Sequence, residues 1–259
     1  MRGLGARVAA MSFEQIEVSI VGAVATVVMS RADALNAITP TMLGELNQAY
    51  DELTANADVQ VLILTGAGRA FSAGVDLKAL GDRELTGGSV GDILDIPARS
   101  MTDRLANGRL VTIAKVNGFC FTGALELALA CDLMVTAESA KMADTHAKFG
   151  LRPTWGMSQR LPALVGMAKA RELSYTARTF TGAEAAAMGM ACQSVPSEEL
   201  DAAVATLAAQ VVESSAGSLA AYKDLYGVAE SLGIEGGLAY EYSHDYEITD
   251  TDERLAGFR

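Results

Sequence analysis

Histidine and basic residues are scarce in this chain of 259 residues. It contains two histidines, and its 20 lysines and arginines face 32 aspartates and glutamates, which gives a formal net charge of −12. A chain this acidic cannot neutralise phosphates in bulk, so we expect no nucleic-acid partner. The basic residues are scattered rather than clustered, which also argues against binding to an anionic membrane surface.

Cysteine is equally scarce, which limits disulfide and metal chemistry. Cys120, Cys131 and Cys192 are odd in number and show no Cys-x-x-Cys spacing, so we expect reduced thiols in a cytoplasmic protein. His146 and His244 are too far apart in the sequence to form a ligand pair at the usual spacing. We therefore expect no metal site.

Long apolar runs are absent as well. No segment approaches the roughly 20 apolar residues that a membrane span needs, and the Val-Ala-Ala run near the N-terminus is too short for a signal peptide. We expect a soluble protein whose residues 1–11 form a flexible extension, with Met1 and Met11 both candidate start sites. Half of the residues are hydrophobic, enough for a large core in a main domain with a smaller appendage.

Strand-like and helical segments alternate over residues 12–196, which predicts an α/β fold. From Pro196 onward the pattern is helical only, so residues 197–259 are predicted to form a helical region that packs on the core or serves in oligomerisation. The predicted strands are a hairpin over 13–30 and the runs 59–66, 110–118, 132–138 and 141–143, and the predicted helices are 40–56, 197–214, 216–231 and 236–247, followed by a short acidic helix.

Three segments carry candidate functional groups. The first, "GAGRAFSAGVDLKAL" (66–80), follows a predicted strand and is rich in glycine, as are turns that expose backbone N–H groups at the end of a sheet. It lacks the features of a phosphate loop, because no Gly-Lys-Ser/Thr follows. Asp76 is equally suited to capping the short helix after it, so structural and functional interpretations both remain.

The second segment is "VNGFCFTGALELALACD" (116–132), in which a helix is predicted to begin near Gly123. The start of a helix offers unpaired N–H groups suited to a developing oxyanion. Glu126 lies three residues further on, among apolar neighbours, where burial raises the pKa of a carboxyl toward the range of a general acid or base. A buried structural ion pair is the alternative.

The third segment, "KMADTHAKFGLRPTWGMSQRLPALVG" (141–166), places His146 in a loop before a helix that begins at Gly156. A lone histidine in a loop is more often structural than catalytic, and its own sequence surroundings do not decide between the two roles.

Taken together, these segments resemble the crotonase superfamily, the enoyl-CoA hydratase/isomerase family. The resemblance covers nearly the whole chain, from the paired N-terminal strands through "RADALNAIT" and the three segments above to the C-terminal helices. It implies a crotonase-like spiral of ββα units with a C-terminal α-helical trimerisation region, a homotrimer or homohexamer, and an acyl-CoA thioester as substrate. Coenzyme A is then part of the substrate, and no separate cofactor is expected.

The resemblance also implies roles for individual residues. The backbone N–H groups of Val75 and Gly123 would bind the thioester oxygen. Glu126 matches the first of two glutamates that hold water and deliver a proton in the hydratases, but His146 stands where the second is expected. Three interpretations follow: hydration with Glu126 as base and His146 as acid, double-bond isomerisation by one carboxylate, or a hydrolase or other acyl-CoA reaction. A binding protein without catalysis is a further alternative.

Substrate-binding residues follow less specifically. Coenzyme A is expected along the "ADALNA" and "SAGVDLK" segments, and Trp155 is expected in the acyl pocket or in plain core packing. Asp144 does not align with the family's site, and residues 81–100 are expected to shape the acyl pocket. The expected binding residues are Ala34, Asn36, Ala37, Ala73, Gly74, Asp76 and Trp155.

Overall fold

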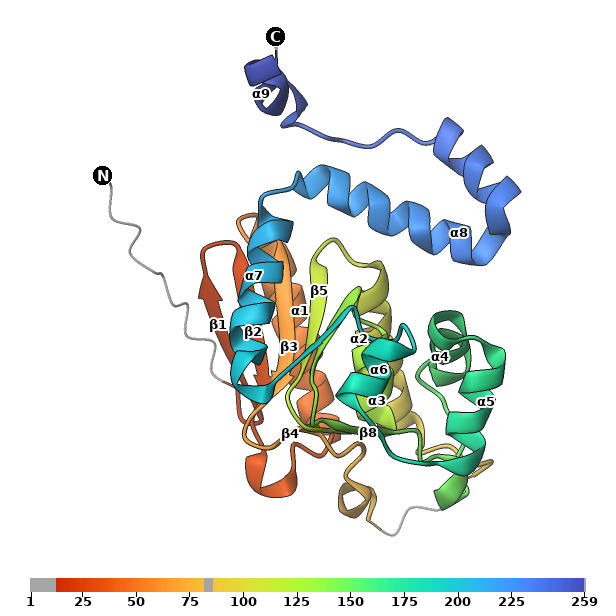
Figure 1. Ribbon diagram of the computed structural model, residues 1–259. Coiled ribbons are helices and arrows are strands. Elements are labelled where there is room, and N and C mark those ends of the chain that lie inside the picture. The colour runs from red at the N-terminus through yellow and green to blue at the C-terminus, as the bar shows by residue number, and fades with distance from the viewer. Residues whose placement is uncertain (1–12, 82–85, 259) are drawn as a thin grey trace.

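The computed structural model describes residues 13–81 and 86–258, which form an α/β body and a helical C-terminal region, the last part of which (residues 216–258) lies above the body (Figure 1). The predicted extension over residues 1–11, including Met1 and Met11, lies outside the described residues, as do residues 82–85 of the stretch expected to shape the acyl pocket.

A six-stranded sheet forms the centre of the body, in the order β1-β2-β3-β5-β7-β10. β1 and β2 form the predicted antiparallel hairpin, and the strands from β2 to β10 run parallel. β3 is buried along its whole length, as its uninterrupted apolar sequence predicts. The strands are Ile16–Val21 (β1), Val24–Met29 (β2), Val61–Gly66 (β3), Val111–Val116 (β5), Leu133–Ala137 (β7) and Gln193–Val195 (β10).

A smaller sheet, in the order β4-β6-β8-β9, is what positions the three functional segments. β4, β6 and β8 each follow a strand of the large sheet and are parallel to one another, so their carboxyl ends lie at one edge. Residues 73–76, 122–126 and 144–146 begin at those ends. The four strands are Ala70–Ser72 (β4), Phe119–Phe121 (β6), Lys141–Ala143 (β8) and Phe180–Thr181 (β9).

Helices cover the body. α1 (Pro40–Ala55) confirms the predicted helix: the Thr39 hydroxyl caps it by accepting from the Met42 N–H, and its apolar face is buried. α2 (Asp92–Asn107) was not predicted, because it lacks a side-chain cap and contains Pro97. The remaining helices of the body are α3 (Gly123–Leu129), α4 (Met157–Val165), α5 (Met167–Thr176) and α6 (Gly182–Ala187), with 3-10 turns η1 (Ala32–Ala34), η2 (Leu77–Leu80) and η3 (Ala147–Phe149).

The C-terminal region is helical, as predicted. α7 (Leu200–Val212) follows the turn η4 (Ser197–Glu199) and packs on the large sheet through buried Leu200, Val204 and Ala208. α8 (Ala216–Ser243) is kinked at Gly233, close to the predicted break, and α9 (Thr251–Leu255) with η5 (Ala256–Phe258) is the short acidic helix. The predicted extension of a helix to residue 247 is wrong, because His244 has an extended backbone and stacks on Tyr240.

The predicted α/β class with a helical C-terminal region is therefore confirmed, while the domain boundary at residue 196 stays a prediction. Within residues 13–81 and 86–258, no helix is long and apolar enough to span a membrane.

Candidate active site

The turn after β4 presents one of the two expected backbone donors. Ile38 forms a parallel bridge with Val75, in which the Ile38 N–H donates to Gly74 and the Asp76 N–H donates to Ile38. The N–H of Val75 consequently points away from Ile38, and it has no hydrogen-bond partner among the described residues.

The start of α3 supplies the second donor. Gly123 is the first residue of this helix, and the side chain of Thr122 does not cap it, so the Gly123 N–H also has no partner within the described part of the chain. The two turns are in contact: a Cβ added at Gly74 would lie 2.7 Å from the Phe121 carbonyl oxygen. Gly74 has a positive φ of 92°, which together with this close approach makes glycine the fitting residue.

Glu126 is a buried carboxyl next to these donors, with 1% of its surface exposed. Its Oε1 accepts hydrogen bonds from the N–H groups of Trp155 and Met157, both at 3.0 Å. Burial raises the pKa of Glu126 above its usual value, and the His146 ring and the two N–H donors offset only part of that effect. Both of these N–H donors bind Oε1, so the second oxygen, Oε2, is available for proton transfer.

His146 faces that second oxygen. Its Nε2 lies 3.6 Å from Glu126 Oε2, and the side chain is 9% exposed. The loop is fixed to the start of α3, because the Thr122 N–H donates to Ala143 at 2.9 Å and the Thr122 and Thr145 hydroxyls are hydrogen-bonded. The structure thus brings the expected catalytic residues together, although they lie twenty positions apart.

Asp144, which does not align with the family's site and was given little weight, directly contacts His146. Its Oδ1 is 2.7 Å from His146 Nδ1, and its Oδ2 accepts a hydrogen bond from Ser174 of α5 at 2.7 Å. Burial alone would raise the pKa of Asp144, but the bonds from His146 and Ser174 hold it below its usual value. The Asp-x-His spacing was the sequence signal that could have revealed this pair, whereas nothing local marks Ser174.

Trp155 is buried against the start of α3. A Cβ added at Gly123 would lie 2.5 Å from the Trp155 ring, and its Nε1 donates to Asp95 of α2 at 2.8 Å. Asp95 also accepts from the hydroxyls of Thr154 and Ser89. Burial opposes ionisation of Asp95, but these donors hold its pKa below the usual value. Trp155 therefore packs against the start of α3 and is held there by Asp95. Its expected place in the acyl pocket stays a prediction.

Replacement of Asp95 should show how far this support matters for stability. Asp95→Ala leaves three donors without their acceptor, all of them on buried or half-buried residues, so we expect a loss of about 3 kcal/mol in the free energy of unfolding. Because the folded-state pKa of Asp95 is depressed, its stabilisation is present above the usual carboxyl pKa and is lost as the pH falls below it. Urea titrations of both proteins at a series of pH values would measure this, and equal midpoints would contradict it.

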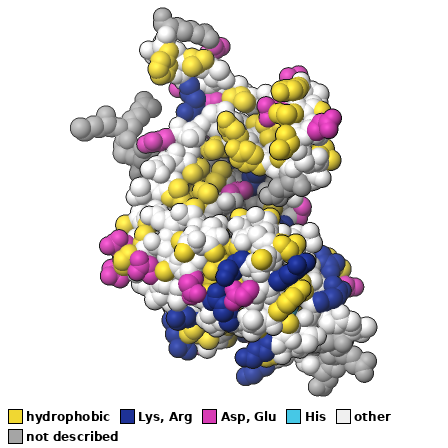
Figure 2. All heavy atoms as spheres, turned by 45° about the vertical axis from the view of Figure 1, so that its right-hand side comes forward, with side chains coloured by type: hydrophobic (Ala, Val, Ile, Leu, Met, Phe, Trp, Pro, Cys, Tyr) yellow, Lys and Arg dark blue, Asp and Glu magenta, His cyan; other side chains and the backbone are white. Residues whose placement is uncertain are grey.

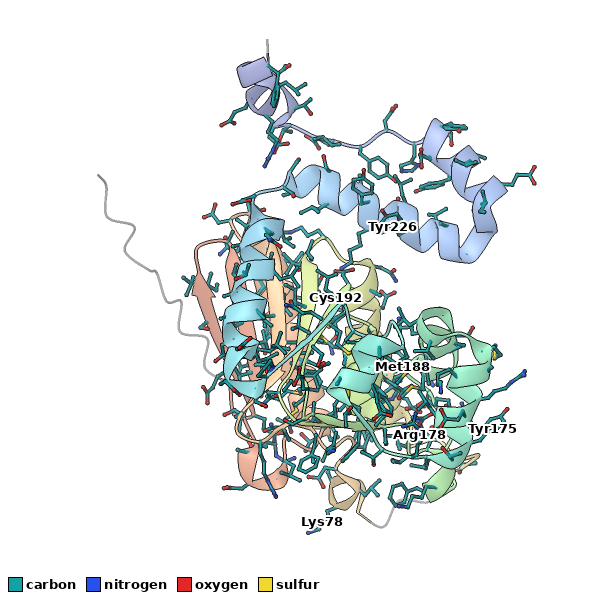
Figure 3. All side chains as sticks on the ribbon, viewed as in Figure 1. Lys78, Tyr175, Arg178, Met188, Cys192 and Tyr226 are labelled. Atoms are coloured by element: carbon teal, nitrogen blue, oxygen red, sulfur yellow. The ribbon has the colours of Figure 1, made fainter. Side chains whose placement is uncertain are left out.

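The residues expected to bind coenzyme A lie on the turns around Val75, but two of their side chains are already engaged. Asn36 is fully buried and bonds to Arg31, Ala67 and Ala70. Asp76 caps η2 and pairs with Arg31 at 3.0 Å. Ala34, Ala37 and Ala73 hold the same turns together through backbone bonds. Lys78 of the neighbouring turn η2 is exposed, and its side chain points away from the body (Figure 3).

A pocket of about 430 Å³ lies beside His146 and is lined by residues of α4, α5 and η3. Asp144, His146 and Ser174 contribute to its lining, and Tyr175 lies at the outer edge of α5 (Figure 3). Neither Val75 nor Gly123 is among its lining residues.

Comparison with known proteins places this architecture in a family. The family model described as enoyl-CoA hydratase/isomerase matches residues 19–258. A probable peroxisomal enoyl-CoA hydratase of Arabidopsis thaliana is 35% identical over 236 residues, covering 90% of this chain and 87% of the relative. A probable enoyl-CoA hydratase of Mycobacterium tuberculosis is 32% identical over 251 residues, covering 96% of each.

Solved structures agree. An enoyl-CoA hydratase from Bacillus anthracis superimposes with a TM-score of 0.87 at 28% identity, covering 95% of this chain and 96% of that one. A putative enoyl-CoA hydratase from Thermobifida fusca, in complex with acetoacetyl-CoA, gives 0.79 at 30% identity, covering 94% and 95%.

The chain therefore belongs to the enoyl-CoA hydratase/isomerase family of the crotonase superfamily. The predicted crotonase-like fold is confirmed, and so, at the level of the family, is the prediction of an enoyl-CoA hydratase-like enzyme.

Proposed function

We propose that the protein hydrates a 2-enoyl-CoA, with Val75 and Gly123 as oxyanion donors and Glu126 and His146 as the acid/base pair. The observation that carries this is the buried Glu126–His146 pair, 3.6 Å apart, beside two backbone N–H groups without partners among the described residues. Two titratable groups so close can contact one water molecule together, which is what addition of water to a double bond requires.

The chemistry follows from the charges that develop. As the water oxygen attacks Cβ, the electrons of the double bond move toward the thioester carbonyl, whose oxygen becomes negative and is stabilised by the two N–H donors. One member of the pair takes a proton from the water, and the other delivers a proton to Cα. Exclusion of water strengthens each of these electrostatic interactions, and both Glu126 and His146 are buried.

A pair of absorbance assays tests the proposal. Purified protein incubated with crotonyl-CoA should bleach the conjugated thioester absorbance, which reports hydration. With a 3-enoyl-CoA, a gain of that absorbance would show isomerisation instead. Release of free thiol from either thioester would indicate a hydrolase. Binding without any of these changes would favour a protein that has kept the pocket and lost catalysis.

The substrate's coenzyme A portion is proposed to lie along Ala34, Asn36, Ala37, Ala73, Gly74 and Asp76, with Trp155 near the acyl group. The structures of the Thermobifida fusca relative with coenzyme A and with acetoacetyl-CoA support this class of ligand. We propose no metal or separate cofactor; among the described residues, no group of three or more His, Cys, Asp or Glu side chains could hold a metal ion. A cytoplasmic location is proposed from the three unpaired cysteines.

We also propose that the chain assembles as a homotrimer or homohexamer through its C-terminal helices. Figure 2 shows hydrophobic side chains gathered on this upper region, and on α8 Tyr226, Leu232, Ile234 and Tyr242 are all at least 60% exposed. Such a surface is typical of an interface.

The assembly can be measured directly. Light scattering should give three or six times the chain mass of 27.0 kDa. Ile234, which is 83% exposed, is the natural position for a test: Ile234→Asp should lower the mass toward that of the single chain, since a buried charge opposes association. Ser231→Asp, on the same helix, is the control for added charge. A wild-type mass of 27.0 kDa would contradict the proposal.

A further inference from the structure

The contacts of Asp144 account for both of its oxygens. Oδ1 lies 2.7 Å from the ring nitrogen Nδ1 of His146 and accepts a hydrogen bond from the His146 backbone N–H at 3.2 Å. Oδ2 accepts a hydrogen bond from the Ser174 hydroxyl at 2.7 Å. Asp144 is 3% exposed, and Ser174 comes from a different element, α5. The Asp144 carboxylate is thus fixed by hydrogen bonds from two elements, and it in turn fixes the orientation of the His146 ring.

An ionised carboxylate can only accept hydrogen bonds. The Nδ1 atom that faces Asp144 must therefore carry the hydrogen, and in a neutral imidazole the other nitrogen, Nε2, then has a free lone pair. That nitrogen is the one that faces Glu126 Oε2 at 3.6 Å.

We propose that Asp144 and Ser174 are positioning residues that fix His146 with its hydrogen on Nδ1, so that the proton used in turnover passes through Nε2. The role of His146 in proton transfer rests on the proposed function, whereas the contacts that fix its ring do not. It also assigns roles within the pair: His146 begins as the base, and Glu126 begins as the acid. This is the reverse of the assignment expected from the sequence.

The burial of Glu126 supports this division of roles, because its raised pKa favours the protonated carboxyl. In the hydration step, Nε2 takes a proton from water as the O–Cβ bond forms. The electron pair of the double bond moves through Cα toward the thioester oxygen, and Cα then takes the proton of Glu126. Asp144 stabilises the imidazolium that remains. Transfer of the Nε2 proton from His146 to Glu126 restores the starting state, and one water molecule has been consumed.

Other charged groups near His146 are weaker influences. The pocket that it borders is also lined by Arg152, Arg171 and Tyr175, but both arginines are exposed to solvent, where screening reduces their effect. Glu126 and Asp144 are the buried carboxyl groups in direct contact with the ring.

Kinetics of Asp144→Asn test the positioning role. The amide oxygen can still accept a hydrogen bond, but the charge that stabilises the imidazolium is lost. We expect kcat with crotonyl-CoA to fall at least about tenfold, with KM little changed because Asp144 is not proposed to touch substrate. The acidic limb of the pH profile should move to lower pH, since removal of a negative charge favours the neutral ring. Ser174→Ala should also lower kcat, more weakly, because it removes one of the bonds that hold the carboxylate in place.

Asp132→Asn is a matched control. Asp132 also accepts from a backbone N–H and a hydroxyl, both of Thr112, and pairs with Lys223 at 2.8 Å, away from the site. Its replacement should lower stability and leave the acidic limb in place. An unchanged kcat and acidic limb in Asp144→Asn would overturn the inference.

The tautomer can be observed without any substrate. Because the chain has two histidines, solid-state NMR of the full-length protein with 13C,15N-labelled histidine gives two ring signals, and His244→Gln identifies that of His146. At about pH 8 we expect a protonated Nδ1, recognised by its bond to Cγ, and a bare Nε2. A bare Nδ1 would overturn the positioning role, and a doubly protonated ring would overturn the assignment of acid and base. Failure of crotonyl-CoA as a substrate would instead contradict the proposed function alone.

Discussion

Replacement of Glu126 by glutamine is expected to reduce turnover by about 10²- to 10⁴-fold, the usual contribution of a general acid or base. Glutamine keeps an oxygen that can accept the N–H groups of Trp155 and Met157, so the surrounding backbone should stay in place. It cannot donate and regain a proton, so the step at Cα loses its proton source. Measured with crotonyl-CoA, the loss should fall on kcat rather than on KM.

The same variant should not be less stable, which separates a catalytic role from a structural one. Because burial raises the folded-state pKa of Glu126, the folded protein loses stability as the pH rises from the usual carboxyl pKa to the raised value. Above that range, a glutamine that never ionises avoids this loss. The free energy of unfolding of Glu126→Gln at about pH 8 should therefore equal or exceed that of the wild type.

Glu45→Gln provides the matched control, because the carboxylate of Glu45 on α1 also accepts two backbone N–H groups, those of Glu14 and Gln15 at 2.7 and 2.8 Å. It makes no contact with Glu126 or His146, so its replacement should leave turnover unchanged. Activity of Glu126→Gln within a few-fold of wild type would remove Glu126 from the mechanism.

The fold was predictable from the sequence where the pattern of apolar and polar residues in a segment matches the burial of that segment. The apolar run of β3 and the capped start of α1 are both read directly from residue type. α2 was missed because it has no capping side chain and contains Pro97, so its stability depends on packing rather than on local signals. Of the second sheet, only β8 was predicted, because the four strands are two or three residues long and pair across the chain.

The site shows the same division. Gly123 and Glu126 lie on one helix, so their proximity follows from helical spacing. The closeness of His146 depends on the pairing of β6 with β8, which local sequence does not reveal. Asp144 was given little weight because it has no counterpart in the family motif, yet its neighbour two residues on is the ring that it holds. Ser174 reaches the site only through the packing of α5.

Gly123→Ala is expected to lower turnover by about 10²- to 10³-fold, the effect of removing one oxyanion donor. The new Cβ would lie 2.5 Å from the Trp155 ring, closer than atoms can pack. That ring cannot easily withdraw, because Asp95 holds its Nε1 and Glu126 holds its backbone N–H. The start of α3 must shift instead, and the N–H of residue 123 shifts with it. Overpacking should also cost about 1–3 kcal/mol in the free energy of unfolding.

Gly44→Ala separates this steric effect from the general consequences of replacing glycine. Gly44 lies inside α1, and a Cβ there meets nothing within 4 Å, so alanine should stabilise the protein by about 0.5–1 kcal/mol and leave turnover unchanged. Combining Gly123→Ala with Trp155→Leu frees the space taken by the ring. If the clash is the cause, the double variant should be more stable than the sum of the two single changes predicts. Additive losses would show that the ring does not restrain the helix, and wild-type turnover in Gly123→Ala would exclude residue 123 as an oxyanion donor.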